Sequence, residues 1–313
     1  YSWRVSTPLS NFEANLNYKD IQDPSVTLRF KINGEDKLYF LAWTTTPWTL
    51  PSNMALCVGP NLKYCKIKDQ KSGDCYILTK SRVDSYFEHG NFKVIDEILG
   101  TELKGKTYEP LFDFARKHVD LTNTWTVQID DYVSDESGTG IVHLACFGED
   151  DVRIFKREGI PIFDPVDEEG NFKNFMGFIS GINIKDAEKK IIQHLKIEKK
   201  IFLHETVNHS YPFCWRTDTP LIYKPISTWF VNVEKIKDRM VSHNKTVHWV
   251  PNHIRDGRFG KWLENARDWA ISRNRFWGTP LPVWKSDDGK ILCVGSVSEL
   301  ENVSGEKIID LHK

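Results

Sequence analysis

Short runs of alternating apolar and polar residues fill the first half of the chain. The runs at residues 26–32 and 38–43 are rich in β-branched and aromatic side chains, and Asn33-Gly34 lies between them. This arrangement predicts a β-hairpin. Similar runs recur at residues 63–67, 74–78, 124–132 and 140–145. Many short strands at this spacing predict a closed or nearly closed β-barrel.

Two helices are expected within this β pattern. One begins near Asp150 and runs to Glu158, where Gly159 ends it. The other spans residues 185–198, whose apolar side chains recur at helical spacing. Residues 185–200 carry six lysines against three acids, a pattern that fits either a solvated face or a contact with a nucleic-acid backbone.

The sequence changes character after about residue 205. Aromatic and arginine-rich segments follow at residues 211–216 and 269–278. We therefore expect one domain at residues 1–205 and a second segment at residues 206–313. The expected fold class is mainly β with α, as a β-barrel-like domain with peripheral helices followed by an α/β segment.

Composition narrows the classes of protein that fit these elements. The 313 residues are 40% hydrophobic, which is enough for one large core or two modest ones. A formal net charge of −1 argues against a uniformly basic domain, so any RNA contact must be local. The chain has no run of about 20 apolar residues, and residues 1–8 lack the pattern of a signal peptide. We expect neither a membrane segment nor secretion.

The cysteines and the first residue add two expectations. Six cysteines are scattered without Cys-x-x-Cys spacing, which is typical of reduced thiols in a cytoplasmic protein. The chain begins at Tyr1 rather than at a methionine, so we expect it to be a piece of a larger protein.

A first candidate for chemistry is the threonine-rich segment at residues 43–53. Three consecutive threonines at the end of a predicted strand fit an ordinary strand, because threonine favours strands. Pro47 and Pro51 cannot continue a central strand, so the chain leaves the sheet there. The hydroxyls of Thr45, Thr46 and Thr49 can then face a cleft, where they suit an ester substrate.

A second candidate is the segment at residues 138–151. His143 shares its strand face with Ile141 and fits either a core histidine or a cleft residue. Asp150 and Asp151 fit the N-cap and first turn of the following helix. Alternatively, one of the two carboxylates faces a cleft and holds a substrate ammonium group by a charge-assisted hydrogen bond.

Two other hydrolase chemistries are disfavoured by spacing. A nucleophilic Cys146 needs a nearby base, but in an extended segment the side chain of His143 points to the opposite face. A metal hydrolase is disfavoured because His143, Cys146 and Asp151 lack a recognisable ligand spacing.

Together, the two segments resemble the editing domain (CP1) inserted in class I tRNA synthetases. The string Trp43-Thr44-Thr45-Thr46-Pro47-Trp48-Thr49-Leu50-Pro51 is similar to that of isoleucyl-tRNA synthetases, whereas the valyl and leucyl relatives carry Thr-Thr-Arg-Pro there. The resemblance covers nearly the whole chain. It continues at residues 7–13, 164–167, 209–212 and 271–282.

The resemblance implies a pocket between the two segments for the 3′-terminal adenosine of tRNA and its aminoacyl group. In this pocket, Asp151 is implied to bind the α-ammonium group, and His143 to limit the space so that valine enters and isoleucine does not. Thr45 and Thr46 are implied to act with Asp151 in catalysis by positioning water. The other implied substrate-binding residues are Thr44, Trp48, Thr49, Asn53 and Asp150.

Three departures from the family pattern modify this expectation. Ala145-Cys146-Phe147 is one residue shorter than usual and lacks a proline. This difference changes the direction of the loop that carries Asp151 and leaves Asp150 as the alternative residue to bind the ammonium group. Cys214 does not begin the Cys-x-x-Cys zinc motif of the bacterial type, so the resemblance is to the eukaryotic cytoplasmic type. The signatures His-x-Gly-His and Lys-Met-Ser-Lys-Ser are absent, so this chain is not expected to activate isoleucine.

The implied function is hydrolysis of valine wrongly attached to the isoleucine tRNA, with valyl-adenylate as a second candidate substrate. The implied partners are the valine-charged 3′ end of tRNA(Ile) and the rest of the synthetase chain. No metal or cofactor is implied for editing, because ATP and magnesium belong to the full-length enzyme.

The alternative function is a tRNA-docking module without turnover. It rests on basic residues interleaved with Trp262, Trp269 and Trp277 and opposed by few acids. The same segment fits packing against a catalytic nucleotide-binding domain in the whole enzyme. The basic residues are Arg255, Arg258, Lys261, Arg267, Arg273, Arg275 and Lys285, and the acids are Asp256, Glu264 and Asp268.

Overall fold

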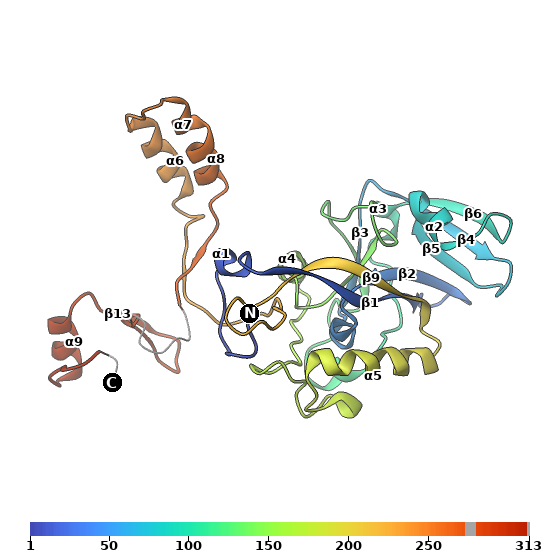
Figure 1. Ribbon diagram of the computed structural model, residues 1–313, viewed down its shortest axis with the longest axis horizontal. Helices are drawn as coiled ribbons and strands as arrows, with labels where there is room; N and C mark the ends of the chain where they lie inside the picture. The colour runs from blue at the N-terminus through green and yellow to red at the C-terminus, as the bar shows by residue number, and fades with distance from the viewer. Residues whose placement is uncertain (273–279, 312–313) are drawn as a thin grey trace. The chain divides into compact units, whose positions relative to one another are not determined.

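The strands expected from the alternating pattern form two sheets (Figure 1). The computed structural model describes residues 1–272 and 280–311. The larger sheet has the strand order β6-β4-β5-β2-β1-β9, and the smaller sheet has the order β7-β3-β8. The bounds are Tyr18–Lys31 (β1), Leu38–Thr44 (β2), Ala55–Val58 (β3), Lys63–Asp69 (β4), Cys75–Thr79 (β5), Phe92–Leu99 (β6), Thr126–Ile129 (β7), Ile141–Leu144 (β8) and Ile201–Pro212 (β9).

The predicted hairpin is confirmed. β1 and β2 pair antiparallel from Val26 opposite Thr44 to Lys31 opposite Tyr39. Gly34 lies in the connecting turn with φ +77°, a conformation that glycine adopts without a steric penalty. The runs predicted at 63–67, 74–78, 124–132 and 140–145 correspond to β4, β5, β7 and β8.

The six-stranded and three-stranded sheets do not close into a barrel. β6 and β9 are the edges of the larger sheet. The first half of β1 pairs with β9 alone, so the two strands leave the sheet as a ribbon. Pro24 is tolerated in this ribbon because only one side of β1 is paired there. The mainly β class with helices is thus confirmed, as an open mixed sheet rather than a closed barrel.

Both predicted helices are confirmed. α4 spans Glu149–Glu158 and ends at Gly159, which has φ +65°. α5 spans Ile184–Ile197 and is capped at its N-terminus by Asn183, whose side chain accepts a hydrogen bond from the Lys185 backbone. The shorter helices of this part of the chain are α1 (Asn11–Ala14), η1 (Pro47–Ser52), η2 (Lys80–Arg82), α2 (Val83–Tyr86), α3 (Gly100–Leu103), η3 (Phe114–Lys117) and η4 (Gly177–Ile179).

One large core joins the two sheets to α4 and α5. Phe30, Trp48, Leu56 and Phe155 are almost completely buried in it. Burial of each such side chain contributes roughly 1.5–3 kcal/mol before the entropy of ordering is subtracted. A second cluster, which includes Tyr76, packs separately from the large core. The threonine-rich segment is therefore held by the large core itself.

β9 crosses the expected domain boundary at residues 205 and 206. It stays paired with β1 as far as Pro212 opposite Tyr18. The first compact unit accordingly extends over Tyr1–Pro225, and the second over Ile226–Lys313. The change in composition after residue 205 marks the second half of a strand, and the compact unit ends later.

The described residues of the second unit form four helices, of which α6, α7 and α8 contact one another. The ring centroid of Phe259 lies 4.8 Å from that of Trp249 and 5.5 Å from that of Trp262. Arg273, Arg275 and Trp277 lie outside the described residues. The bounds are β10 (Phe230–Val231), α6 (Lys237–Thr246), α7 (His253–Asp256), α8 (Arg258–Glu264), β11 (Trp269–Ala270), β12 (Val283–Lys285), β13 (Ile291–Cys293) and α9 (Val297–Ser304).

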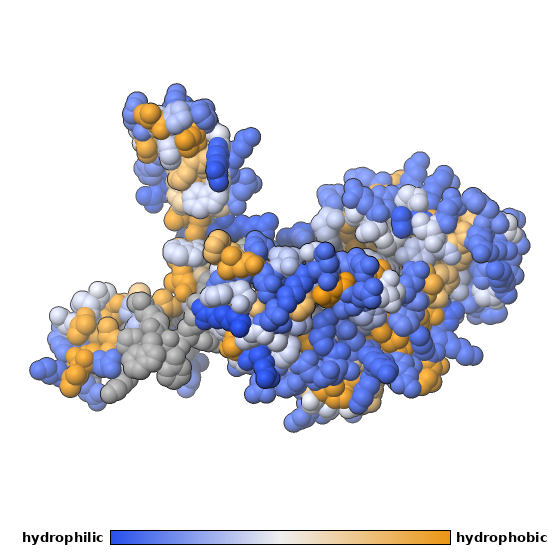
Figure 2. Space-filling model, in the orientation of Figure 1, coloured by the Kyte–Doolittle hydropathy of each residue, from blue (hydrophilic) through white to orange (hydrophobic). Residues whose placement is uncertain are grey.

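The surface of the first unit is largely polar on the face seen in Figure 2. Lys189, Lys190 and Lys196 of α5 are exposed. No helix within residues 1–272 and 280–311 has the length and apolar character needed to cross a membrane.

Candidate active site

The threonine-rich segment leaves β2 at the point where the prolines predict it. β2 ends at Thr44, and Pro47 opens the 3-10 helix η1. The Oγ1 atoms of Thr44 and Thr46 lie 3.1 Å apart, and those of Thr46 and Thr49 lie 3.4 Å apart. The Thr49 hydroxyl also donates to the Thr46 carbonyl at 2.8 Å. Three hydroxyls therefore form one connected group at the strand exit.

His143 of β8 joins this group across the fold. Its Nε2 lies 2.9 Å from Thr49 Oγ1, and its Nδ1 lies 3.5 Å from Asn53 Nδ2. Burial lowers the pKa of His143 to about 4, so the ring is neutral at pH 7. Because the Thr49 proton is directed to a carbonyl and the Asn53 Nδ2 group can only donate, we assign the ring proton to Nε2. His143 thus has no unoccupied basic nitrogen.

Asn53 is fixed by residues that the sequence did not single out. Its Oδ1 accepts a hydrogen bond from Tyr108 Oη at 2.8 Å, and its Nδ2 donates to the Ala55 carbonyl at 3.0 Å. The indole of Trp125 donates to the Asn53 carbonyl at 3.1 Å. Asn53 is 6% exposed, so it contributes to the site chiefly by orienting His143.

Asp151 lies in the first turn of α4 and turns back toward β8. Its Oδ2 accepts a hydrogen bond from the Ala145 backbone at 3.1 Å. Burial raises the pKa of the carboxyl to about 6, and the negative charge of Asp150 adds to the rise. A Cβ at Gly148 would lie 2.9 Å from the Asp151 carboxyl group, so glycine at the helix N-cap lets this carboxylate approach.

Asp150 has a different environment from its neighbour. It is exposed, and its Oδ1 accepts hydrogen bonds from Arg153 Nη2 at 2.9 Å and Nε at 3.2 Å. Both acids belong to the first turn of α4, as the helix pattern predicted. Of the two, Asp151 turns inward while Asp150 is held at the surface.

Trp48 and Thr45 complete the predicted set. Trp48 is 2% exposed, and its ring centroid lies 4.7 Å from that of Phe147, in the loop before α4. Thr45 is partly exposed, and its hydroxyl makes no hydrogen bond to another described residue. The contacts Thr49–His143 and Trp48–Phe147 bring the two predicted segments together.

The geometry also bears on the two disfavoured chemistries. The Cys146 thiol donates to the Phe163 carbonyl at 3.1 Å, and burial raises its pKa well above the usual value. A thiol held in this way is not a nucleophile. Within the described residues, no three His, Cys, Asp or Glu side chains are grouped so that they could hold a metal ion.

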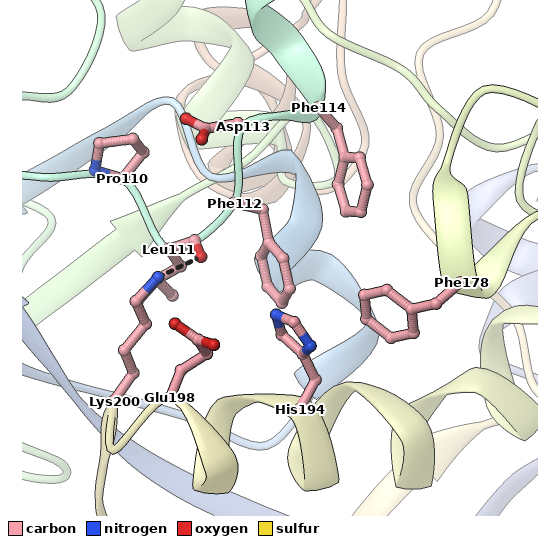
Figure 3. Close-up of a pocket in the computed structure, with 9 residues that line it drawn as sticks. All are labelled: Pro110, Leu111, Phe112, Asp113, Phe114, Phe178, His194, Glu198 and Lys200. Atoms are coloured by element: carbon pink, nitrogen blue, oxygen red, sulfur yellow. Dashed lines mark hydrogen bonds between the residues drawn. The ribbon is translucent and has the colours of Figure 1, made fainter.

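A hollow of about 320 Å³ lies elsewhere on the first unit, between the 110–114 segment and the end of α5 (Figure 3). The rings of Phe112 and Phe178 each pair with His194, at centroid distances of 5.5 and 4.7 Å. Lys200 donates to the Leu111 carbonyl at 2.7 Å on its other side. This hollow shares no lining residue with the threonine and histidine group.

The sequence matches the family model of class I tRNA synthetases for isoleucine, leucine, methionine and valine over residues 1–312. The chain belongs to this family. It is 51% identical over 314 residues to the isoleucine--tRNA ligase of Chlamydia abortus, and 49% identical over 315 residues to that of Bdellovibrio bacteriovorus. Each comparison covers 100% of this chain and 30% of the relative. This class I synthetase chain thus spans about a third of the length of those ligases.

Solved structures similar to this class I synthetase chain include editing domains. GlLeuRS-CP1 matches with a TM-score of 0.46 and 15% identity, over 58% of this chain and 99% of that chain. The editing domain of the Plasmodium falciparum cytosolic leucyl-tRNA synthetase matches with a TM-score of 0.45 and 10% identity, over 58% and 99% of the two chains.

Proposed function

We propose that this chain is the editing domain of an isoleucine–tRNA ligase and hydrolyses the ester that joins valine to tRNA(Ile). The observation that carries the proposal is the meeting of the two segments through the Thr49–His143 contact. The Asp151 carboxylate lies close to this contact, because it accepts a hydrogen bond from the Ala145 amide, two residues after His143. The identity to isoleucine–tRNA ligases supports the choice of amino acid. Residues 1–205 belong to the editing domain in this proposal, and residues 206–313 return toward the catalytic domain.

In the proposed mechanism, Asp151 holds the α-ammonium group of valine. An ionised carboxylate in a partly buried site binds an ammonium group by a charge-assisted hydrogen bond and fixes the ester carbonyl. Thr45 and Thr46 orient the attacking water, since the Thr45 hydroxyl has no hydrogen-bond partner among the described residues. His143 is neutral and hydrogen-bonded within the fold, so the proton transfer is assigned to the vicinal ribose hydroxyl of the substrate. This hydroxyl takes a proton from the attacking water and gives its own proton to the leaving ribose oxygen.

Selectivity is proposed to come from exclusion. One methylene in an apolar pocket changes binding by only about 1–3 kcal/mol, a limit for which the isoleucine enzymes are the standard example. The His143 ring, held at both nitrogens, is rigid enough to reject the larger isoleucine side chain. The side of the substrate pocket that His143 forms in this proposal also includes Thr44, Trp48, Thr49 and Asn53. Asp150 is not part of it.

The remaining parts of the proposal follow from the same assignment. Editing needs no cofactor, and its partners are the valine-charged 3′ end of tRNA(Ile) and the rest of the ligase. Six free cysteines fit a cytoplasmic location. The relatives named above are bacterial, so the eukaryotic type rests only on the missing Cys-x-x-Cys motif after Pro212.

The test is deacylation of valyl-tRNA(Ile) and isoleucyl-tRNA(Ile) by the 313-residue chain. We expect loss of valine from the first at a rate well above the spontaneous one, and no acceleration for the second. Binding of tRNA(Ile) without acceleration of either reaction would instead favour the docking-module alternative. Hydrolysis of valyl-adenylate, measured in parallel, decides whether the chain also acts on valine before its transfer to the tRNA.

A further inference from the structure

Two arginines of α4 converge on one nearly buried carboxylate. Arg153 donates from Nη1 and Nη2 to the two oxygens of Asp130, each at 2.9 Å. Arg157 donates from Nη1 to Asp130 Oδ2 at 2.6 Å. The Asp130 side chain is 8% exposed. A bidentate ion pair of this kind fixes the orientation of the guanidinium as well as its distance from the carboxylate.

Asp130 is itself anchored to the small sheet. It directly follows β7, and its backbone donates to the Val58 carbonyl at the end of β3 at 3.1 Å. Its Oδ1 accepts from the Tyr132 backbone at 3.2 Å. The Arg153 guanidinium, aided by Arg157, holds the pKa of this carboxyl well below its usual range. The carboxylate is thus a charged fixed point on the sheet that carries His143.

The helix places these arginines opposite the candidate anchor. Residues 150, 153 and 157 share one face of a helix, and residues 151, 154 and 155 share another. Ile154 and Phe155 are completely buried, so Asp151 lies on the inner face. α4 has only ten residues, too few to be stable alone, and its N-cap residue, Gly148, has no side chain that could cap the helix. The rotation of its first turn is therefore set by inner packing and by the outer arginine contacts.

We propose that the Asp130–Arg153–Arg157 group is a positioning device for Asp151. It locks the first turn of α4 to the small sheet so that the Asp151 carboxylate stays at the Ala145 amide and meets the substrate's ammonium group. The substrate part of this inference rests on the proposed function. Arg153 and Arg157 are positioning residues, since they touch Asp130, Asp150 and Glu158 and no reacting atom.

The test compares two esters on tRNA(Ile) that differ only at the anchored group. One is valyl-tRNA, and the other is 2-hydroxy-3-methylbutanoyl-tRNA, in which a hydroxyl replaces the ammonium group. For Arg153→Gln we expect valyl hydrolysis to fall by about 10- to 100-fold while hydrolysis of the hydroxy ester stays unchanged, because only the anchored reaction depends on the position of Asp151. Arg153→Lys should recover part of the loss.

The matched control is Lys156→Gln, which removes an exposed cation from the same helix. It should leave both reactions unchanged. An equal fall for both esters in Arg153→Gln, or no fall in either, would overturn the positioning role. If the wild-type chain hydrolyses neither ester, the proposed function fails, and hydrogen exchange at the Ala145 amide then decides. Faster exchange in Arg153→Gln than in Lys156→Gln supports the positioning role, and equal exchange overturns it.

Discussion

Asp151 is the residue of the candidate site whose charge changes near neutral pH. Burial raises its pKa to about 6, and only the ionised carboxylate attracts an ammonium group. We expect kcat/KM for valyl-tRNA hydrolysis, corrected for spontaneous hydrolysis, to fall as the pH drops through about 6. Single-turnover deacylation between about pH 5 and pH 8 measures this. A rate independent of pH over that range would contradict the anchor.

The raised pKa of Asp151 affects stability and activity in opposite directions, because the ionised carboxylate that binds substrate is the form that burial disfavours. The folded-state pKa of Asp151 lies above the unfolded value, so its contribution to stability is complete at low pH and is lost as the pH rises through about 6. Asp151→Asn removes this dependence. Urea unfolding at pH 5 and pH 8 should therefore show a smaller loss of stability with rising pH in the variant than in the wild type.

His143 is the residue on which selectivity depends in this account. His143→Ala removes the ring and leaves space that an extra methylene can fill. We expect isoleucyl-tRNA(Ile) to become a substrate, with a gain of roughly 10-fold or more, while valyl-tRNA remains one. Deacylation of both substrates measures the change. Selectivity that survives in His143→Ala would assign the exclusion to another wall residue.

The site residues could be predicted from the sequence only in part. The chain exit after Thr44 was predictable because Pro47 and Pro51 act locally, and the helix beginning near Asp150 was predictable for the same reason. Tyr108 was not, because its contact with Asn53 joins positions 55 residues apart and no pattern marks it. The role of Asp130 was not predictable either, since the Asp130-Asp131 pair after a strand looks like surface residues.

At the scale of elements, β7, β8 and the segment before them hold the site through buried polar contacts. Tyr108→Phe removes the hydroxyl that satisfies Asn53 Oδ1 and leaves a buried acceptor without a partner. We expect a loss of about 1–3 kcal/mol in the free energy of unfolding, measured by urea titration. Tyr39→Phe on β2 is the control, since that hydroxyl has no hydrogen bond to another described residue. Equal effects in both variants would argue against the Asn53 contact.

Periodicity predicted the elements better than their closure. Alternation gave the hairpin and most strands, because side-chain period is a local property of the backbone. The expected closure of the barrel was wrong, because closure depends on which edge strands pair. The pairing of β9 with β1 joins segments far apart in the chain, and a local pattern of apolar and polar residues does not predict such a pairing. The expected boundary at residue 205 fell inside β9 for the same reason.

At the scale of the whole molecule, the two compact units predict how the chain can be shortened. A chain ending at Pro225 keeps all of β9, whereas one ending at Glu205 leaves the first half of β1 unpaired. We expect residues 1–225 to unfold cooperatively and residues 1–205 to lose cooperative unfolding. Thermal unfolding followed by circular dichroism compares them. Cooperative unfolding of 1–205 would show that the β1–β9 ribbon is dispensable for the fold.

The central claim is that Asp151, and not Asp150, anchors the amino group in an editing site. The most direct measurement is single-turnover deacylation of valyl-tRNA(Ile) by the wild-type chain, Asp151→Ala and Asp150→Ala. We predict that hydrolysis is lost in Asp151→Ala and largely kept in Asp150→Ala. Loss confined to Asp150→Ala, or wild-type rates in both variants, would contradict the claim.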